Sequence, residues 1–249
     1  MIVLAISEGD KQWLKANYPE LEIEKDKDGC VTIIGTLKFD MIFYEEGKPY
    51  VIKPQPKHIN SGYRIQDEYQ IKIVLKSSKH SDLPQVFEIG GRLNSIANDR
   101  GFKLTDLHIN PDEMACLCLN IEEESYLQNG FIIEEFFNLL VIPFFYAQSY
   151  FEKNASWPWG QYSHGSVGIF EWCYEQSNLT ENATKELINR LRELTDWQMV
   201  KPYLDHKKTA KGHHECLCGS KKKFRNCHED ALHGIWKLKQ NIETYSVKL

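Results

Sequence analysis

The sequence predicts an α+β protein in which an N-terminal helix precedes several strands and further helices follow them. Three observations support this fold class. A capped helical segment opens the chain, stretches rich in Val, Ile, Thr and Phe lie between residues 30 and 87, and a long apolar segment follows residue 130. Because strands and helices occur in separate blocks rather than in alternation, a doubly wound parallel sheet is not expected.

The first block is expected to contain one helix followed by several strands. These elements cover residues 8–17 (helix) and 30–44, 50–52, 69–75 and 83–87 (strands). Ser7 can cap the helix and Pro19 closes it, while Pro84 marks the last strand as an edge strand. The glycines that follow predict irregular chain over residues 90–106.

The second block is expected to be helical. Residues 131–151 form a strongly apolar segment that predicts a buried helix, broken or kinked at Pro143. A further helix is expected around Glu171, and Asn178 or Thr180 can start a last amphipathic helix.

Composition is ordinary for a chain that buries a core: 249 residues, 42% hydrophobic, with a net charge of -5. The longest apolar run, residues 139–147, is too short for a membrane helix, and the N-terminus lacks the pattern of a secretory signal. We therefore expect a cytoplasmic protein without a membrane partner. Charge is uneven, since residues 201–249 carry +6 and the first 200 residues carry −11, which predicts parts with different partners.

Seven cysteines, an odd number, argue against a disulfide framework and for metal binding or catalysis. Near the C-terminus, Cys216, Cys218, Cys227 and His228 supply three thiolates and one imidazole, a complete tetrahedral set for zinc with no open position. This spacing resembles the SEC-C motif, Cys-x-Cys-(eight residues)-Cys-(Cys or His). His213 and His214 lie nearby, but His228 fits the motif better.

The segment around these ligands is basic, with Lys221, Lys222, Lys223 and Arg225 between Cys218 and Cys227. We expect the zinc to be structural, because this segment is too short for a core of its own. The charges can dock an acidic protein surface, can contact nucleic acid, or can form a solvated face. Protein docking is favoured over nucleic acid.

A second constellation combines His108, Asn110 and Cys118. A cysteine after a strand, with a His and an Asn nearby, is a candidate nucleophile. The order of elements here resembles the ubiquitin-conjugating enzymes, which have an N-terminal helix, a strand meander, a His-Pro-Asn tripeptide and a cysteine eight residues after its Asn. Asn110 and Cys118 have that spacing, although Ile109 replaces the proline and Cys116 adds a second thiol.

The resemblance implies a ubiquitin-conjugating-like catalytic domain over residues 1–155, a helical connector over 156–205 and a zinc-binding tail over 206–249. It implies that Cys118 carries a protein C-terminus as a thioester and passes it to an amine on a target. Asn110 would then stabilise the oxyanion, and His108 would hold the Asn loop.

The departures from the family pattern fit divergent bacterial members, many of which lie in antiphage operons that include nucleotide-cyclising synthases. The expected partners are therefore a ubiquitin-like protein or a nucleotidyltransferase C-terminus, with or without a separate activating enzyme. The alternative is a non-catalytic binding module of the same fold, docked to a partner or to RNA through its basic zinc tail.

Three further features have open interpretations. Cys116 and Cys118 are either chemical groups or small buried hydrophobes. Residues 122–124, all glutamates, are expected to form a solvated charge run. The Trp-rich loop at residues 157–165 is expected to pack at a core edge, although His164 can instead serve the cysteine site as an acid or base.

Overall fold

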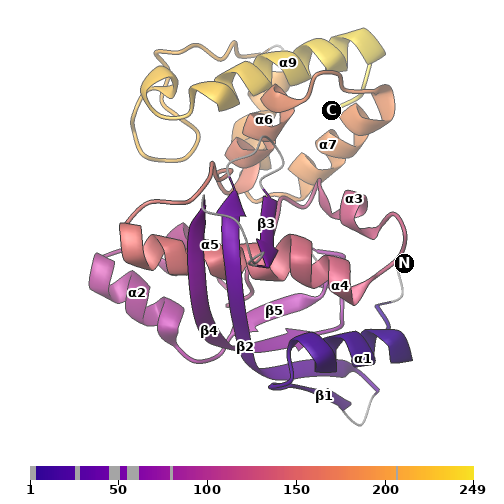
Figure 1. Ribbon diagram of the computed structural model, residues 1–249. Helices are drawn as coiled ribbons and strands as arrows, with labels where there is room; N and C mark the ends of the chain where they lie inside the picture. Colours follow the sequence, from indigo (N-terminus) through magenta and orange to yellow (C-terminus); the bar gives the residue numbers. More distant parts are fainter. Residues whose placement is uncertain (1–3, 26–28, 45–50, 55–61, 79–80, 206) are drawn as a thin grey trace. The chain divides into compact units, whose positions relative to one another are not determined.

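The computed structural model describes residues 4–25, 29–44, 51–54, 62–78, 81–205 and 207–249 (Figure 1). The chain divides into two compact units, the first ending at Gly160 and the second starting at Gln161. The predicted α+β class is confirmed, with strands confined to the first unit. The sequence analysis expects a separate connector over residues 156–205 and a tail over 206–249. In the structure, residues 161–249 belong to one compact unit.

The first unit is built on an antiparallel sheet in the strand order β1-β2-β4-β5, with β3 paired to the far end of β2. Its strands are β1 (Leu21–Lys25), β2 (Val31–Tyr44), β3 (Val51–Pro54), β4 (Tyr63–Val74) and β5 (Gln85–Glu88). β2 and β4 form the longest ladder, from the pair Thr32 and Val74 to the pair Phe43 and Tyr63. Each predicted strand is present and β1 is additional, although residue 50 of the strand expected over 50–52 lies outside the described residues.

Helix α1 (Glu8–Asn17) begins as the sequence predicts. Ser7 and Asp10 form a capping box, in which each side chain accepts a hydrogen bond from the main-chain N–H of the other. Leu14 is buried in the core of the first unit, and the ring of Trp13 contacts Phe137 at a centroid distance of 5.8 Å. The N-terminal helix is therefore packed against the apolar helix that follows the sheet.

That apolar helix is nearly continuous. It consists of three consecutive elements: α4 (Ile133–Phe136), a π-helical turn η2 (Phe137–Val141) and α5 (Ile142–Asn154). Pro143 lies in the first turn of α5 and the π turn directly precedes it, so the N–H of Ile142 donates to Phe137 O, five residues earlier. The wider turn accommodates a proline that lacks an N–H and crowds the preceding turn. The predicted interruption at Pro143 is thus a π turn and not a break.

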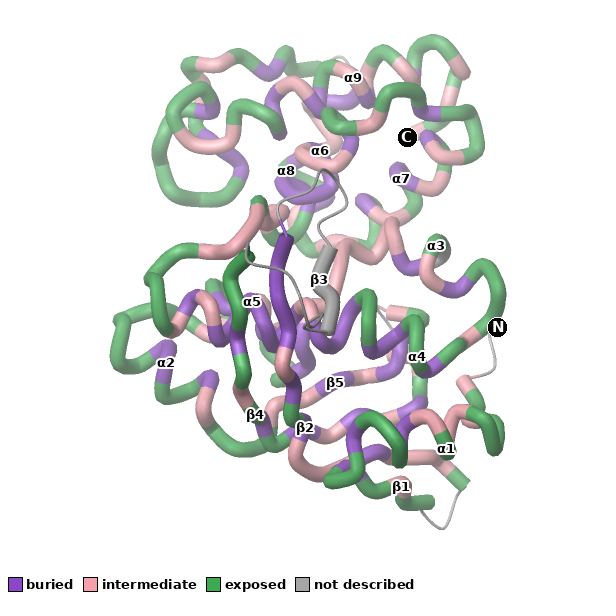
Figure 2. The backbone as a smooth tube through the Cα atoms, in the orientation of Figure 1, coloured by how far each residue is buried: buried purple, intermediate pink, exposed green. Residues whose placement is uncertain are grey.

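Buried residues concentrate on α5 and on the strands β2 and β4 against which it packs (Figure 2). Aromatic rings make this contact: Phe145 lies 4.7 Å from Tyr69 on β4, and Tyr146 lies 6.5 Å from Phe43 on β2, measured between centroids. Phe145 and Tyr146 are fully buried. Packing of large rings onto one sheet face fixes α5, and with it the segment that connects the sheet to this helix.

The prediction of irregular chain over residues 90–106 is wrong. Helix α2 (Arg92–Arg100) and the short 3₁₀ helix η1 (Leu104–Leu107) occupy this segment. Gly91 and Gly101 flank α2 in the left-handed conformation, with φ of 78° and 69°. These glycines therefore mark the two ends of a helix rather than a loop, because only glycine adopts this conformation without strain.

The second unit is helical around the loop that carries the candidate metal ligands. Its helices are α6 (Gly165–Glu175), α7 (Glu181–Glu193), α8 (Trp197–Leu204), the 3₁₀ turn η3 (Phe224–Asn226) and α9 (Glu229–Tyr245). Thr180 caps α7, as predicted, through a hydrogen bond from the N–H of Ala183. α9 crosses α6 at Gly234, where an added Cβ would lie 1.8 Å from Phe170 O. This close approach requires glycine.

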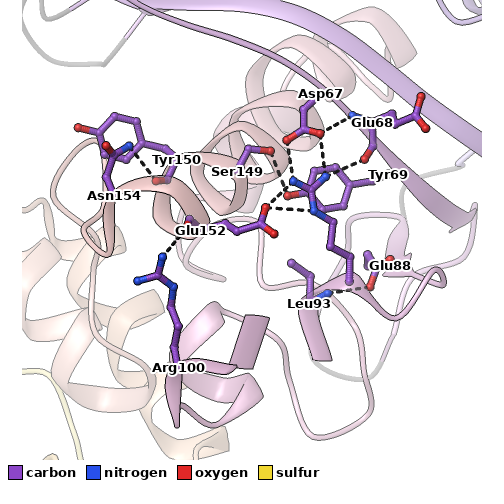
Figure 3. A network of polar contacts seen from close by, with 11 residues as sticks. Asp67, Glu68, Tyr69, Glu88, Leu93, Arg100, Ser149, Tyr150, Glu152 and Asn154 are labelled. Carbon is purple, nitrogen blue, oxygen red and sulfur yellow. Dashed lines mark hydrogen bonds and ion pairs between the residues drawn. The ribbon is translucent and has the colours of Figure 1, made fainter. Parts of the chain in front are cut away.

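Arg92 is the centre of a polar network that joins α2 to β4 and α5 (Figure 3). Its guanidinium donates two hydrogen bonds of 2.8 Å to Asp67, contacts Glu152, and lies 4.4 Å from the ring centre of Tyr69. Tyr69 is in turn hydrogen-bonded to Ser149 on α5, at 3.0 Å. Burial alone would raise the pKa of Asp67, but hydrogen bonds from Arg92 and Ser149 outweigh it and lower that pKa.

We predict that Arg92→Met destabilises the first unit by about 3 kcal/mol, because two partly buried carboxylates lose their shared cation. Arg64→Met is the matched control: it breaks an exposed pair with Asp40 and should change the free energy of unfolding little. Urea titration, with hydrogen exchange of the β4 amides as the readout, measures the free energy of unfolding of both variants.

The difference in the free energy of unfolding between these two variants also depends on pH. Since the pKa of Asp67 is below its ordinary value of 3.8, its contribution is complete above that pH and is lost as the pH falls further. Equal stabilities of Arg92→Met and Arg64→Met at neutral pH would contradict the assigned role of this network.

Candidate functional site

The four predicted metal ligands lie together in the second unit. The ligand atoms of Cys216, Cys218, Cys227 and His228 are all within 4.8 Å of one another. Nδ1 of His228 is 3.1 Å from Cys216 Sγ and 3.3 Å from Cys227 Sγ, and the sulfurs of Cys218 and Cys227 are 3.6 Å apart. Sulfurs bound tetrahedrally at about 2.3 Å from zinc are roughly 3.8 Å apart, so the spacing already suits such an ion.

Local backbone geometry creates this arrangement. The N–H of Cys216 donates to Lys222 O at 2.7 Å, which closes a small loop between the bridge residues Glu215 and Lys223. Gly219 turns that loop with φ of 78°. Phe224, fully buried, then starts η3, which presents Cys227 and leads directly into α9.

The thiols of this cluster differ in acidity. Burial raises the pKa of Cys216 to about 12. Burial also acts on Cys218, but hydrogen bonds from Ser220 outweigh it and lower the pKa of Cys218 to about 6. Ser220 Oγ lies 3.1 Å from Cys218 Sγ and 3.2 Å from Cys227 Sγ.

With three sulfurs and one nitrogen, this set has the composition of a closed structural metal site and leaves no position for a catalytic water. His213 and His214, the competing residues, pair with each other at a ring distance of 4.8 Å. Neither belongs to the cluster of ligand atoms found among the described residues.

The second constellation lies on a small hairpin in the first unit. Ile109 and Ala115 form an antiparallel bridge, and the N–H of Cys116 donates to His108 O at 2.8 Å. The N–H of Ala115 also donates to Val86 O on β5, at 2.8 Å. The hairpin is therefore attached to the last strand of the sheet.

The turn of this hairpin holds Asn110. The N–H of Asn110 donates to Met114 O, so Asn110 lies near the turn. Cys118 lies four residues beyond Met114 in the sequence. Within the described chain no hydrogen bond joins the side chains of Asn110 and Cys118. Cys116 and Cys118 are not on a strand, and the thiol of Cys116 contacts Cys118 O at 3.7 Å.

The surroundings of Cys118 favour a protonated thiol. Burial raises its pKa well above 9.0, and the carboxylates of Glu123 and Glu122 raise it further. For Cys116, burial first and Glu123 second raise the pKa to about 11. Both thiols are thus neutral at physiological pH in this conformation.

Glu123, at the start of α3 (Glu123–Leu127), corrects the expectation of a solvated charge run. Its side chain is 4% exposed and accepts a hydrogen bond of 2.7 Å from the N–H of Asp82. Glu122 is half-buried, and the side chain of Glu124 lies outside the described residues. The neighbourhood of the cysteines is therefore acidic and partly closed to water.

The Trp-rich loop packs as expected. Trp157 lies 4.5 Å from Phe151 and 5.4 Å from His108, between ring centres, and Trp159 lies 5.1 Å from Phe43. His108 thus contacts the core edge with its ring. His164 is exposed at the N-terminus of α6 in the second unit, so its suggested role beside Cys118 stays untested.

Comparison with protein families, with characterised proteins and with solved structures gives no match for this chain. Among the described residues, no helix has the length and apolar character needed to cross a bilayer.

Several residues of these sites carry no sequence signal. Ser220 lies inside the ligand loop, and its two contacts to sulfur depend on the turn at Gly219. Glu123 is buried only because Asp82, far away in sequence, supplies an N–H. No spacing rule would have selected either residue.

We predict that the protein binds one metal ion per chain and that Cys227→Ser abolishes this binding, since three remaining ligands hold a divalent ion poorly. Cys30→Ser, outside the cluster, should retain the ion. Elemental analysis of the purified, dialysed variants measures the stoichiometry. Full metal content in Cys227→Ser would refute the assignment.

We also predict slow alkylation of Cys118 by iodoacetamide in the folded protein at pH 7.5. Because only the thiolate reacts and the pKa is raised, the rate should increase about tenfold per pH unit up to that pKa. Peptide mass spectrometry after timed quenching gives the rate, with Cys30 in the same sample as the internal reference. A rate that is already at its plateau at neutral pH would contradict the assigned environment.

Proposed function

We propose that the first unit is a ubiquitin-conjugating-like acyl carrier and that the second unit holds a structural zinc ion. One observation carries the first part: an N-terminal helix and an antiparallel sheet, β1-β2-β4-β5, are followed, after α2 and η1, by a His108–Cys118 segment attached to the last strand. The order of helix, meander, His-x-Asn and cysteine is that of the family which the sequence resembles.

In the proposed reaction, the sulfur of Cys118 attacks the carbonyl carbon of an activated C-terminus and displaces its leaving group. An amine then attacks the resulting thioester, the C–S bond breaks, and the sulfur takes back a proton as the amide forms. Asn110 would donate its side-chain N–H to the oxyanion, and His108 would hold the hairpin. The proposal requires the side chain of Asn110 to reach the thioester oxygen when a donor is bound.

The raised pKa of Cys118 sets a further requirement. A thiol that is neutral at pH 7 needs a base or a change of surroundings before it can attack. Docking of the donor protein can supply this change by placing cations against Glu122 and Glu123. The proposed donors are a ubiquitin-like protein or a nucleotidyltransferase C-terminus, delivered by an activating enzyme or already activated, in a bacterial antiphage setting.

Zinc fits the donor set of the second unit better than harder cations do, because Cys and His are its usual ligands. Cys216, Cys218, Cys227 and His228 would hold it, and its binding would supply folding energy to the loop. The exposed Lys221, with its basic neighbours, makes an acidic protein surface the proposed contact of this loop.

We predict that a reductant-labile protein adduct forms on the wild-type chain when it is purified with its operon neighbours without reductant. Cys118→Ala should lose this adduct, while Cys116→Ala, the matched thiol control, should retain it. Asn110→Ala should lower the transfer rate by about 10²–10³-fold if it stabilises the oxyanion. Intact mass spectrometry before and after reductant follows the adduct. A clean, unmodified mass in all samples would overturn the carrier proposal.

One observation favours the second candidate, a non-catalytic binding module of the same fold. Burial and the carboxylates of Glu123 and Glu122 raise the pKa of Cys118, which disfavours the nucleophilic thiolate. In that case Cys118→Ala leaves the biological activity intact, whereas neutralising Lys221 and Lys222 together abolishes it. A phage-protection assay with these two variants separates the two functions.

A further inference from the structure

The outer edge of β5 is only partly paired. Ala115 donates to Val86 O, so the main chain of Val86 points away from β4. Main-chain groups of alternate residues in a strand point to the same side, and Glu88 therefore directs its N–H and C=O outward as well. Within the described part of the chain, neither group has a hydrogen-bond partner.

The hairpin ends before it can pair with Glu88. The N–H of Glu113 donates to Asn110 O at 2.9 Å, which closes the turn. Glu113 itself has φ of 67°, a left-handed conformation that is uncommon for a residue with a side chain. The turn thus reverses the chain beside Val86 and leaves the next position of the edge open.

A hollow of about 420 Å³ lies beside this open position. Its apolar wall consists of Phe87, Ile89, Leu93, Leu104 and Ile109. Ile89 is 48% exposed, a large apolar side chain with much of its surface in water. The volume is within the range of pockets that bind ligands.

The side chain of Glu88 does not fill this hollow, because it caps α2. Its carboxylate accepts hydrogen bonds from the N–H groups of Gly90, at 2.8 Å, and Leu93, at 3.2 Å. Lys72 and Glu113 contribute charges of opposite sign to the lining, so the site has no strong preference for a charged ligand.

We propose that this open edge and hollow bind an extended peptide of a partner protein, which adds as a strand beside Glu88 and inserts an apolar side chain. An N–H and a C=O that face outward from a strand match the main chain of a peptide, and the sheet continues without a change of geometry. The apolar wall matches an aliphatic or aromatic residue. Such binding goes beyond acyl transfer, because Cys118 lies past Ala115, in the direction away from Glu88.

A fluorescein-labelled octapeptide in which Leu alternates with Thr and Lys is a direct probe for the full-length protein. Fluorescence anisotropy should detect saturable binding. Replacing each Leu by Ala should abolish it, because the apolar anchor is lost. N-methylation of the peptide amides, which leaves the Leu side chains in place, should weaken it about tenfold through loss of main-chain hydrogen bonds.

Asn94→Trp and Asn98→Trp form a matched pair on α2. Both positions are exposed and lie one turn apart, but only Asn94 lines the hollow. Asn94→Trp should weaken peptide binding at least tenfold by filling the hollow, and Asn98→Trp should leave it unchanged. Both variants should retain the Cys118 adduct, so failure of this site and failure of the carrier proposal are distinguishable.

Three results would overturn the proposal: equal binding of the N-methylated peptide, equal binding by Asn94→Trp, or no binding of the alternating peptide. A concentration-dependent dimer that Asn94→Trp abolishes, seen by light scattering, would assign the edge to a second copy of the chain instead.

Discussion

The arrangement of the first unit depends on the partly buried guanidinium of Arg92. Asp67 on β4 and Glu152 on α5 share this one cation, which also lies on the ring of Tyr69. α2 has only nine residues, too few to be stable alone in water, so its position has to come from tertiary contacts. The network therefore fixes a helix that in turn forms one wall of the hollow beside β5.

A comparable constraint operates in the second unit, at the metal ligands. The loop from Glu215 to Lys223 has a single bridge, and its main apolar anchor is the buried Phe224. An ion bound to Cys216 and Cys218 on one side and to Cys227 and His228 on the other would join this loop to the start of α9. Since α9 packs on α6 through Gly234, that bond would connect the loop to the helical core of the unit.

Local signals in the sequence were sufficient for several elements. Ser7 and Thr180 cap helices as expected, and the Cys and His residues of the tail converge as their spacing indicates. Gly91 and Gly101 were misinterpreted, because a glycine marks a helix end and a loop equally well.

Contacts between distant residues account for the rest. The Arg92 network joins residues 67, 92 and 152, and the buried carboxylate of Glu123 accepts a hydrogen bond from the N–H of Asp82. The hydrophobic periodicity of the sequence does not indicate contacts between residues so far apart. The hairpin shows the same limit at the candidate thiol site. The eight-residue spacing of Asn110 and Cys118 can be read from the sequence, but the turn in which the N–H of Asn110 donates to Met114 O cannot. The catalytic roles of the two residues stay a prediction.

The environment of Cys118 bears on how an acyl carrier would work. Burial and two nearby carboxylates penalise a thiolate, whereas an acylated sulfur is neutral and suffers no such penalty. In this conformation the site would thus tolerate the loaded state better than the reactive free thiolate. If the sulfur left as a thiolate, this penalty would oppose transfer until cations or water reached Glu122 and Glu123. A carrier of this kind would hold its cargo until a partner changed the electrostatics of the site, which would couple transfer to docking.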